Sequence, residues 1–184
     1  MNVRSLLWLP FALAAVGCIG TRPEQARYDE LRRLGADDDG DEEHNPGYPC
    51  VDCHGRDYAP GDDVFALAGT VYLRASDPYE RGLAGAVVHV RDAEGRELEV
   101  VSNEVGNFMV SVEGGEEDEG EGSEEGEIEI GWWPTYPLEV WVTQGELEQR
   151  METLIEREES CAHCHWRDPS ATSVGRIYLM EDGT

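Results

Sequence analysis

The stretch Phe65-Ala-Leu-Ala-Gly-Thr-Val-Tyr-Leu73 decides the fold class of this 184-residue chain. Its larger apolar residues alternate with small or polar ones at a period of two, which is the pattern of a half-buried β-strand. Similar short segments follow at a spacing of roughly ten residues, separated by Gly, Asp and Asn. They cover residues 85–92, 97–102, 106–112, 138–143 and 176–180. Short strands at this spacing predict an all-β, antiparallel sandwich.

The segment from Glu146 to Glu159 fits two secondary structures. Four of its apolar residues share one helical face at spacings i, i+4, i+7 and i+8: Leu147, Met151, Leu154 and Ile155. A turn at Gln144-Gly145 followed by a strand through Met151 fits equally well. We favour the strand because the resulting hairpin continues the predicted sheet.

Three segments of the predicted sheet carry a more specific pattern. They read Leu-Ala-Gly-Thr-Val-Tyr at 67–72, Gly-Leu-Ala-Gly-Ala-Val-Val-His-Val at 82–90, and Ser-Asn-Glu-Val-Gly-Asn-Phe at 102–108. This pattern resembles the carboxypeptidase regulatory-like, or prealbumin-like, sandwich, closely over residues 64–112 and loosely over the rest of the sheet. The resemblance implies a non-catalytic accessory module. A peptidase is not indicated, because the metal-binding His-Glu-x-x-His pattern is absent from the sequence.

Residues 1–17 are typical of an export signal. Arg4 precedes a mostly apolar stretch from Leu6 to Val16, which is shorter than the about 20 residues that span a bilayer. The end of this stretch and the two residues after it, Ala15-Val16-Gly17-Cys18, resemble the lipobox of bacterial lipoproteins. That resemblance implies that Cys18 is acylated and becomes the mature N-terminus, and Ile19 in place of Asp implies an outer-membrane location in the cell envelope. An ordinary secretory peptide with an incidental Cys18 is the alternative.

Acidic residues dominate the chain. It contains 40 acidic and 14 basic side chains, for a formal charge of −26, and this excludes a nucleic-acid-binding protein. Six acids within residues 37–43 and ten within 113–129 form two runs that repel one another and stay solvated. We therefore expect residues 18–48 to be a lipid-anchored, disordered acidic linker that holds one short helix near Pro23 to Leu34. Residues 113–129 are expected to be a solvated loop of a β-sandwich that covers 49–182.

The four cysteines after Cys18 form two copies of one motif. Residues 50–54 and 161–165 both read Cys-x-x-Cys-His, the attachment signature of c-type haem. Two thiols at this spacing can reach the two vinyl groups of one porphyrin, and the adjoining His meets the iron. The chain resembles small multihaem c-type cytochromes through these motifs alone. They predict two covalently bound haem c groups, with Cys50, Cys53, Cys161 and Cys164 as thioether residues and His54 and His165 as proximal iron ligands.

Two other uses of the four cysteines are chemically possible. Four thiolates can hold a zinc ion, but this leaves both trailing His residues unexplained and suits a reducing compartment better. Two disulfides, or a redox-active pair, are the other alternative. No thioredoxin-like βαβ pattern surrounds either motif, which weakens the redox version.

The distal iron ligands are harder to predict. We expect His44 and His163 to serve, which would close both irons and favour electron transfer over ligand binding. His89 and Met109 are expected on outward faces of strands, and Met151 in the core. One motif precedes the first strand and the other precedes the last, so the two haems would be neighbours if both motifs lie at one end of the sandwich.

These features predict a membrane-anchored dihaem c-type cytochrome that transfers electrons in the bacterial cell envelope. Because the chain is acidic, its redox partner proteins should present a basic docking face. The alternative is a haem-containing surface binding or sensor lipoprotein built on the same non-catalytic sandwich. No paired distal acid and base is evident, so we expect an electron carrier rather than an enzyme such as a haem peroxidase.

Overall fold

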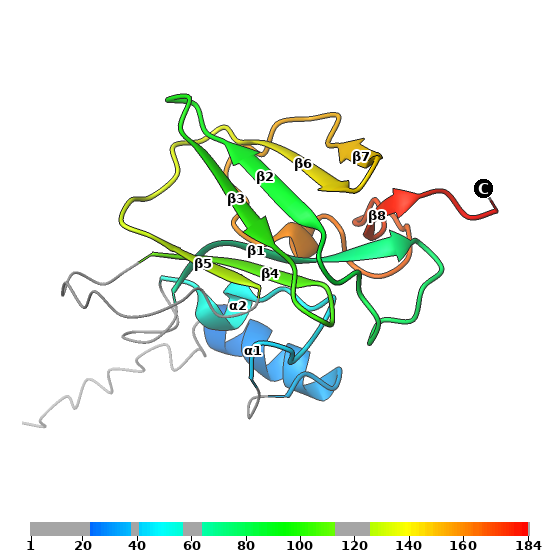
Figure 1. Cartoon of the computed structure of the whole chain (residues 1–184). Coiled ribbons are helices and arrows are strands. Elements are labelled where there is room, and N and C mark those ends of the chain that lie inside the picture. Colours follow the sequence, from blue (N-terminus) through cyan, green and yellow to red (C-terminus); the bar gives the residue numbers. More distant parts are fainter. Residues whose placement is uncertain (1–22, 38–40, 57–63, 113–125, 184) are drawn as a thin grey trace, which may run out of the picture.

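The computed structural model describes residues 23–37, 41–56, 64–112 and 126–183. The predicted signal peptide, Cys18 and most of the second acidic run lie outside these residues. The described chain forms two four-stranded sheets packed face to face (Figure 1). The prediction of a mostly β, two-layer fold is therefore confirmed.

The first sheet has the order β5-β4-β1-β8 and the second the order β3-β2-β6-β7. The strands of the first are β1 (Phe65–Arg74), β4 (Asn107–Val112), β5 (Glu127–Ile130) and β8 (Ile177–Met180). Those of the second are β2 (Val87–Arg91), β3 (Glu97–Val101), β6 (Glu139–Gln144) and β7 (Leu147–Arg150). The helices are α1 (Pro23–Arg33), α2 (Val51–His54) and the 3₁₀ turn η1 (Cys161–His163).

The prediction that all strands pair antiparallel is wrong for two pairs. β8 runs parallel to β1, and β5 runs parallel to β4. A parallel pair needs a long connection, and the acidic run between β4 and β5 supplies one. The expected solvated loop also ends too late, because Glu127 to Glu129 belong to β5. Ile128 and Ile130 pack against the core. Burial of these two side chains explains why the acidic segment forms a strand of the sheet.

The core fills the space between the two sheets. Side chains from the first sheet meet side chains from the second in one buried cluster. Its members include Leu67, Val71, Phe108 and Val110 from one sheet and Val88, Val90, Val140 and Val142 from the other. The predicted strand after Gln144-Gly145 is confirmed as β7, and Gly145 adopts the left-handed conformation (φ 61°) that a tight turn requires.

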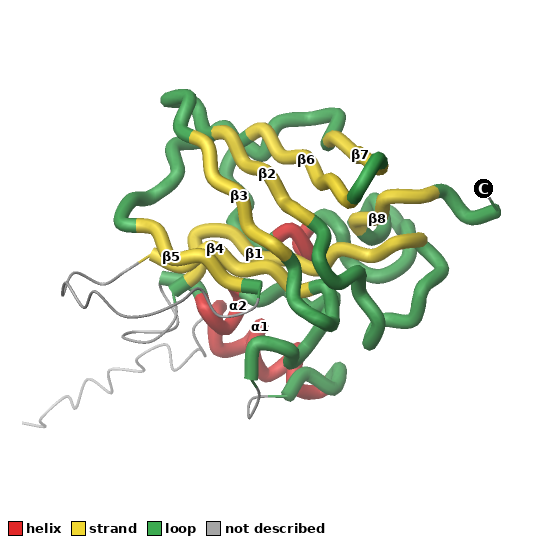
Figure 2. The backbone as a smooth tube through the Cα atoms, viewed as in Figure 1, coloured by secondary structure: helices red, strands yellow, loops and turns green. Residues whose placement is uncertain are grey.

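Helices α1 and α2 lie on the outer face of the first sheet (Figures 1 and 2). The predicted short helix is confirmed as α1, whose Leu31 is 1% exposed. Residues 41–48 differ from the predicted disordered linker, because they are bonded to the first sheet. The Gly47 amide donates to Thr70 Oγ1 at 2.7 Å, and the Asn107 side chain donates to the His44 carbonyl at 3.0 Å. The buried Asn107 side-chain amide needs acceptors, and the carbonyls of Glu42 and His44 provide them.

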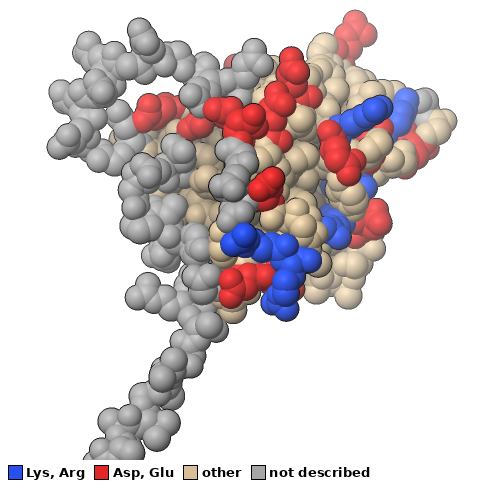
Figure 3. Space-filling model, turned by 90° about the horizontal axis from the view of Figure 1, so that it is seen from below, with Lys and Arg blue, Asp and Glu red and all other residues tan. Residues whose placement is uncertain are grey.

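The lower face of the molecule, where α1 lies, carries arginine and acidic side chains next to one another (Figure 3). Arg27 of α1 illustrates this pattern, since it lies 3.1 Å from Glu30 and 2.8 Å from Asp52. No helix in the described ranges is long and apolar enough to cross a membrane.

Candidate functional site

The structure brings the two Cys-x-x-Cys-His motifs into contact. The first covers the outer face of β1 as α2, and the second lies at the edge of β1 as η1. Ser160 anchors the second motif by a bridge to Ala68. His163 Nε2 lies 2.8 Å from Asp52 Oδ1. A residue between the two cysteines of one motif therefore contacts a residue between the two cysteines of the other. The motifs meet beside the first half of β1, not at a loop end of the sandwich.

Both motifs adopt the same hydrogen-bonded turn. The amide of His54 donates to the Cys50 carbonyl at 2.9 Å, and the amide of His165 donates to the Cys161 carbonyl at 2.8 Å. Residues three and four apart on a helical turn lie on one face. The spacing of the motif therefore places two thiols and one imidazole on the same side of each turn.

The first motif is half-buried on the outer face of the sheet. Cys50 and Val51 pack against a small cluster formed by Phe65, Ala68 and Met109. Met109 was expected to face solvent. It does lie on the outer face, but it is only 5% exposed because α2 covers it.

Two histidines meet beside the first motif. The ring of His54 stacks on Phe65 with centroids 4.7 Å apart. The ring of His44 lies on the segment before α2, with its centroid 5.8 Å from that of His54. His44 Nδ1 contacts the Asp41 carbonyl, and donation there leaves Nε2 with the lone pair that a metal requires.

The second motif is built into the core. Cys161 is buried against β1 and β4, and a Cβ atom at Gly69 would lie 2.8 Å from the Cys161 Cβ and 3.0 Å from the Phe108 ring. Only glycine at position 69 lets the motif approach this closely. Cys164, by contrast, is exposed. Burial raises the pKa of both the Cys50 and the Cys161 thiol to about 12, and no described cysteine is in a disulfide.

His165 is oriented as a ligand histidine would be. Its Nδ1 lies 2.8 Å from the Gly175 carbonyl, so Nδ1 carries the proton and Nε2 carries the lone pair. Burial lowers the pKa of His165, which keeps the ring neutral. A neutral imidazole with a fixed tautomer is the form that binds iron.

A cavity of about 550 Å³ adjoins the second motif. It lies between the sheets where the edge strands β7 and β8 face each other. Cys161, Cys164 and His165 all line it, together with apolar side chains of both sheets that include Phe108 and Met151. Sites for small organic ligands occupy about 300–1,000 Å³. The donor set and the space at the second motif therefore fit a haem group.

His163 is engaged differently from the prediction. Its Nε2 meets Asp52, and its Nδ1 lies 3.0 Å from Glu158 Oε2. The hydrogen bond to Asp52 raises the pKa of His163. Burial would raise the pKa of Asp52, but hydrogen bonds from His163 and Arg27 outweigh it and lower that pKa. In this arrangement His163 joins the motifs and presents no nitrogen to an iron.

Asp52 and Arg27 belong to this site although no pattern in the sequence indicates them. Arg27 Nε donates to Asp52 Oδ2 at 2.8 Å and so ties α1 to the first motif. The partners are separated widely in the sequence, so no local pattern signals their contact. Asp52 in the first turn of α2 also faces the positive end of the helix dipole.

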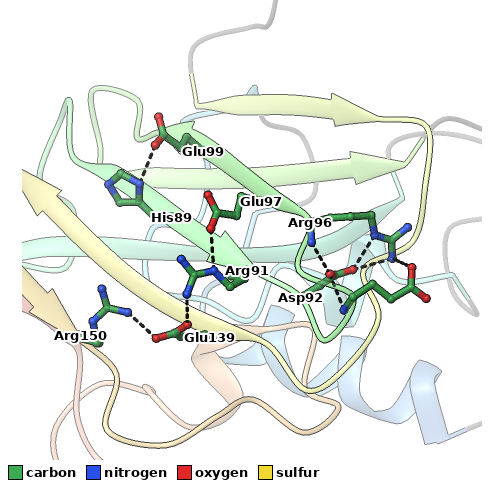
Figure 4. Close-up of polar contacts among 9 residues, drawn as sticks. His89, Arg91, Asp92, Arg96, Glu97, Glu99, Glu139 and Arg150 are labelled. Carbon is green, nitrogen blue, oxygen red and sulfur yellow. Dashed lines mark hydrogen bonds and ion pairs between the residues drawn. The ribbon is translucent and has the colours of Figure 1, made fainter.

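His89 lies on the second sheet, away from its inner face. It stacks on Trp141 with centroids 4.9 Å apart, and its Nδ1 lies 2.9 Å from Glu99 Oε1. Figure 4 shows this outer face, where Arg91 and Arg150 share the Glu139 carboxylate. The His89 side chain is 16% exposed, and its Nε2 lies 2.8 Å from Thr143 Oγ1, so both ring nitrogens meet protein groups on this face.

The described residues contain no group of three or more His, Cys, Asp or Glu side chains placed to hold a metal ion by themselves. A haem iron takes its four equatorial ligands from the porphyrin, so each motif has to supply only an imidazole and two thiols. No family model, curated protein or solved structure matches this chain.

Proposed function

We propose that this chain is a lipid-anchored dihaem c-type cytochrome that transfers electrons in the bacterial cell envelope. One observation carries the proposal. Two Cys-x-x-Cys-His motifs form the same hydrogen-bonded turn and touch through the 2.8 Å contact between Asp52 and His163. Two haem groups attached there would be neighbours, as electron exchange requires.

Each motif residue has a role in the proposal. Cys50, Cys53, Cys161 and Cys164 form the thioether bonds, while His54 and His165 bind iron through Nε2. The Gly175 carbonyl holds the ring of His165 in place. When bound, haem iron supplies one-electron redox chemistry. The chain supplies attachment, orientation and, at the second motif, a largely apolar cavity.

The contacts favour different distal ligands for the two sites. At the first motif we assign this role to His44, because its ring lies beside that of His54. At the second we assign it to Met151, the thioether that lines the same cavity as His165. His163 is assigned to joining the motifs, because carboxylates engage both of its nitrogens.

The remaining parts of the proposal rest on resemblance. The two-sheet fold is compatible with a prealbumin-like, carboxypeptidase regulatory-like module that acts as a non-catalytic scaffold. Acylated Cys18 would anchor it at the outer membrane. Redox partner proteins with a basic face would dock on the acidic surface.

A second function is favoured by the cavity. Its apolar lining and its size at the second motif would also suit a haem-containing surface binding or sensor lipoprotein, in which a small molecule reaches an open iron. The two functions differ in whether both irons are six-coordinate.

The test is spectroscopic. The full chain would be exported together with a haem-maturation system, and its visible spectrum recorded before and after carbon monoxide. Six-coordinate, low-spin bands that carbon monoxide does not shift are expected for electron transfer. Five-coordinate bands, or a carbon monoxide adduct formed at low gas concentration, would replace this function with the sensor.

A further inference from the structure

Two arginines lie against the second motif. Arg167 follows His165 by two residues, and Arg176 directly precedes β8. Both line a small cavity of about 10 Å³ that Cys161 and His165 also line. A cavity of this size holds about one water molecule, so the residues around it lie close together. Both arginines are therefore near neighbours of the cysteine and the histidine that would bind the second haem.

One tyrosine ring holds the two guanidinium groups together. Cζ of Arg176 lies 3.8 Å from the centroid of the Tyr79 ring, and Cζ of Arg167 lies 5.6 Å from it. Contact with an aromatic ring stabilises a cation at that place. In addition, Arg167 Nη2 donates to the Tyr48 hydroxyl at 3.3 Å, and its Cζ lies 4.7 Å from the centroid of the Trp166 ring. These contacts fix two positive charges beside the motif.

Acidic side chains compensate these two charges only weakly. Among the described residues Arg167 has no ion-pair partner. Arg176 pairs with Asp168, whose Oδ1 lies 3.9 Å from Nη2 and whose side chain is 86% exposed, so water screens this carboxylate. Glu158 contacts the second motif, but it is exposed as well and lies against His163. The Arg176 side chain is only 8% exposed, so its charge acts through a medium that screens it less.

The charges beside the first motif are arranged differently. Asp52 belongs to that motif, and its side chain is 12% exposed. Its carboxylate lies 2.8 Å from both Arg27 and His163, which offset its charge. Arg56 occupies the position after the first motif that Arg167 occupies after the second, but Arg56 is exposed. The first motif therefore has no counterpart of the weakly paired, buried arginine at the second.

We propose that Arg167 and Arg176 set the direction of electron transfer between the two haems by raising the reduction potential of the haem at the second motif. The inference rests on the proposed function. Reduction removes one positive charge from the iron, so a nearby cation stabilises the ferrous form. The favourable step moves one electron from ferrous iron at the first motif to ferric iron at the second, with no bond made or broken and no proton transferred. Neither arginine is a ligand, and both act through their charge.

The experiment measures the midpoint potential of each haem on the full chain exported with a haem-maturation system. A redox titration followed in the visible spectrum resolves two one-electron steps. The variant Cys50→Ala/Cys53→Ala retains only the second haem and assigns the steps. We expect the second haem to be reduced first. Equal potentials, or a lower potential at the second haem, would overturn the inference.

Variants separate the effect of the arginines from that of the iron ligands. Arg176→Gln should reduce the equilibrium constant for electron transfer from the first haem to the second about tenfold, which is about 59 mV for a one-electron couple. A unit charge roughly 10 Å away, at an effective dielectric constant of about 20, has an effect of this order. Arg167→Gln should reduce it about threefold, because this side chain is partly exposed.

Two further variants test whether charge is the cause. Arg176→Lys keeps the charge and should retain most of the potential, whereas a purely structural role would be lost in both substitutions. Arg91→Gln removes an arginine that lies on the outer face of the second sheet, outside the lining of both cavities (Figure 4). It should leave both potentials unchanged.

The variants can also contradict the inference. An unchanged second potential in Arg176→Gln would overturn it, and so would an Arg176→Lys variant that lowers the potential as much as Arg176→Gln. Should Arg176→Gln fail to fold, Arg167→Gln decides, because it changes a partly exposed side chain. An unchanged second potential in Arg167→Gln would then overturn the inference.

The inference and the proposed function fail in distinguishable ways. A chain that acquires no covalent haem on export, as its intact mass would show, overturns the cytochrome function and the inference with it. A dihaem chain whose second potential does not respond to either arginine keeps the function and loses the inference. The direction of electron transfer would then be set by the iron ligands alone.

Discussion

The two Cys-x-x-Cys-His motifs are alike in local structure and unlike in surroundings. Both close the same turn from the histidine amide to the first cysteine carbonyl. The first lies half-buried under α1 on the outer face of a sheet, whereas the second is inserted beside Gly69 and faces the inter-sheet cavity. Local spacing therefore sets the turn, and tertiary packing makes the two sites chemically inequivalent.

Removing each pair of thiols should produce the largest effects and expose this inequivalence. Cys50→Ala/Cys53→Ala and Cys161→Ala/Cys164→Ala should each lose one of two haems. The second pair should also destabilise the fold more, by about 1 kcal/mol, because Cys161 is buried in the core. Intact mass and chemical denaturation measure the two effects. Equal losses of stability in the two double variants would show that the two motifs contribute equally to the fold.

Filling the contact at Gly69 should damage the second motif selectively. In Gly69→Ala the new methyl group would meet Cys161 and Phe108, and such overpacking costs about 1–3 kcal/mol. We expect a lower denaturation midpoint and loss of the second haem's spectral signature, with the first unchanged. Gly131→Ala is the matched control, because nothing lies within 4 Å of a Cβ atom at that position.

Truncating the assigned distal ligands should change one iron at a time. His44→Ala should convert only the first haem to high spin, and Met151→Ala only the second, since each removes a sixth ligand. His163→Ala should leave both low-spin. Electron paramagnetic resonance of the oxidised protein distinguishes these species. A high-spin signal from His163→Ala would restore the bis-histidine prediction for that site.

The contact between the motifs should give the smallest effect and a defined pH dependence. Because the folded pKa of His163 is raised, its contribution is complete below about pH 6.5 and is lost as pH rises through the folded value. Because the folded pKa of Asp52 is lowered, its contribution holds above about pH 4 and is lost as pH falls through the folded value. The coupling should therefore be strongest between these limits.

A double-mutant cycle with His163→Gln and Asp52→Asn measures this coupling. With both side chains partly exposed, we expect a coupling of about 1 kcal/mol or less near pH 5.5 and almost none near pH 9. A coupling that does not change with pH would show that charge plays no part in joining the motifs.

The sequence predicts what is local in this molecule. Alternation of apolar residues locates strands β1, β2, β3, β4, β6 and β8, and the helix at Pro23 is recognisable from its flanking Pro and Gly. β5 was missed because its two isoleucines lie within an acidic run. The parallel pairings, the burial of Met109 under α2 and the contact from Asp52 to His163 all join residues far apart in the chain. No local pattern encodes these contacts, so they can be identified only in the three-dimensional structure.

The number of haems on the mature chain tests the central claim most directly. The full sequence would be exported with a haem-maturation system and its intact mass measured, together with its iron content. We predict two covalent haems and two irons per chain, and one of each when either cysteine pair is replaced by alanine. A mature chain that carries no covalent haem, with its four cysteines paired as disulfides or bound to zinc, would contradict it.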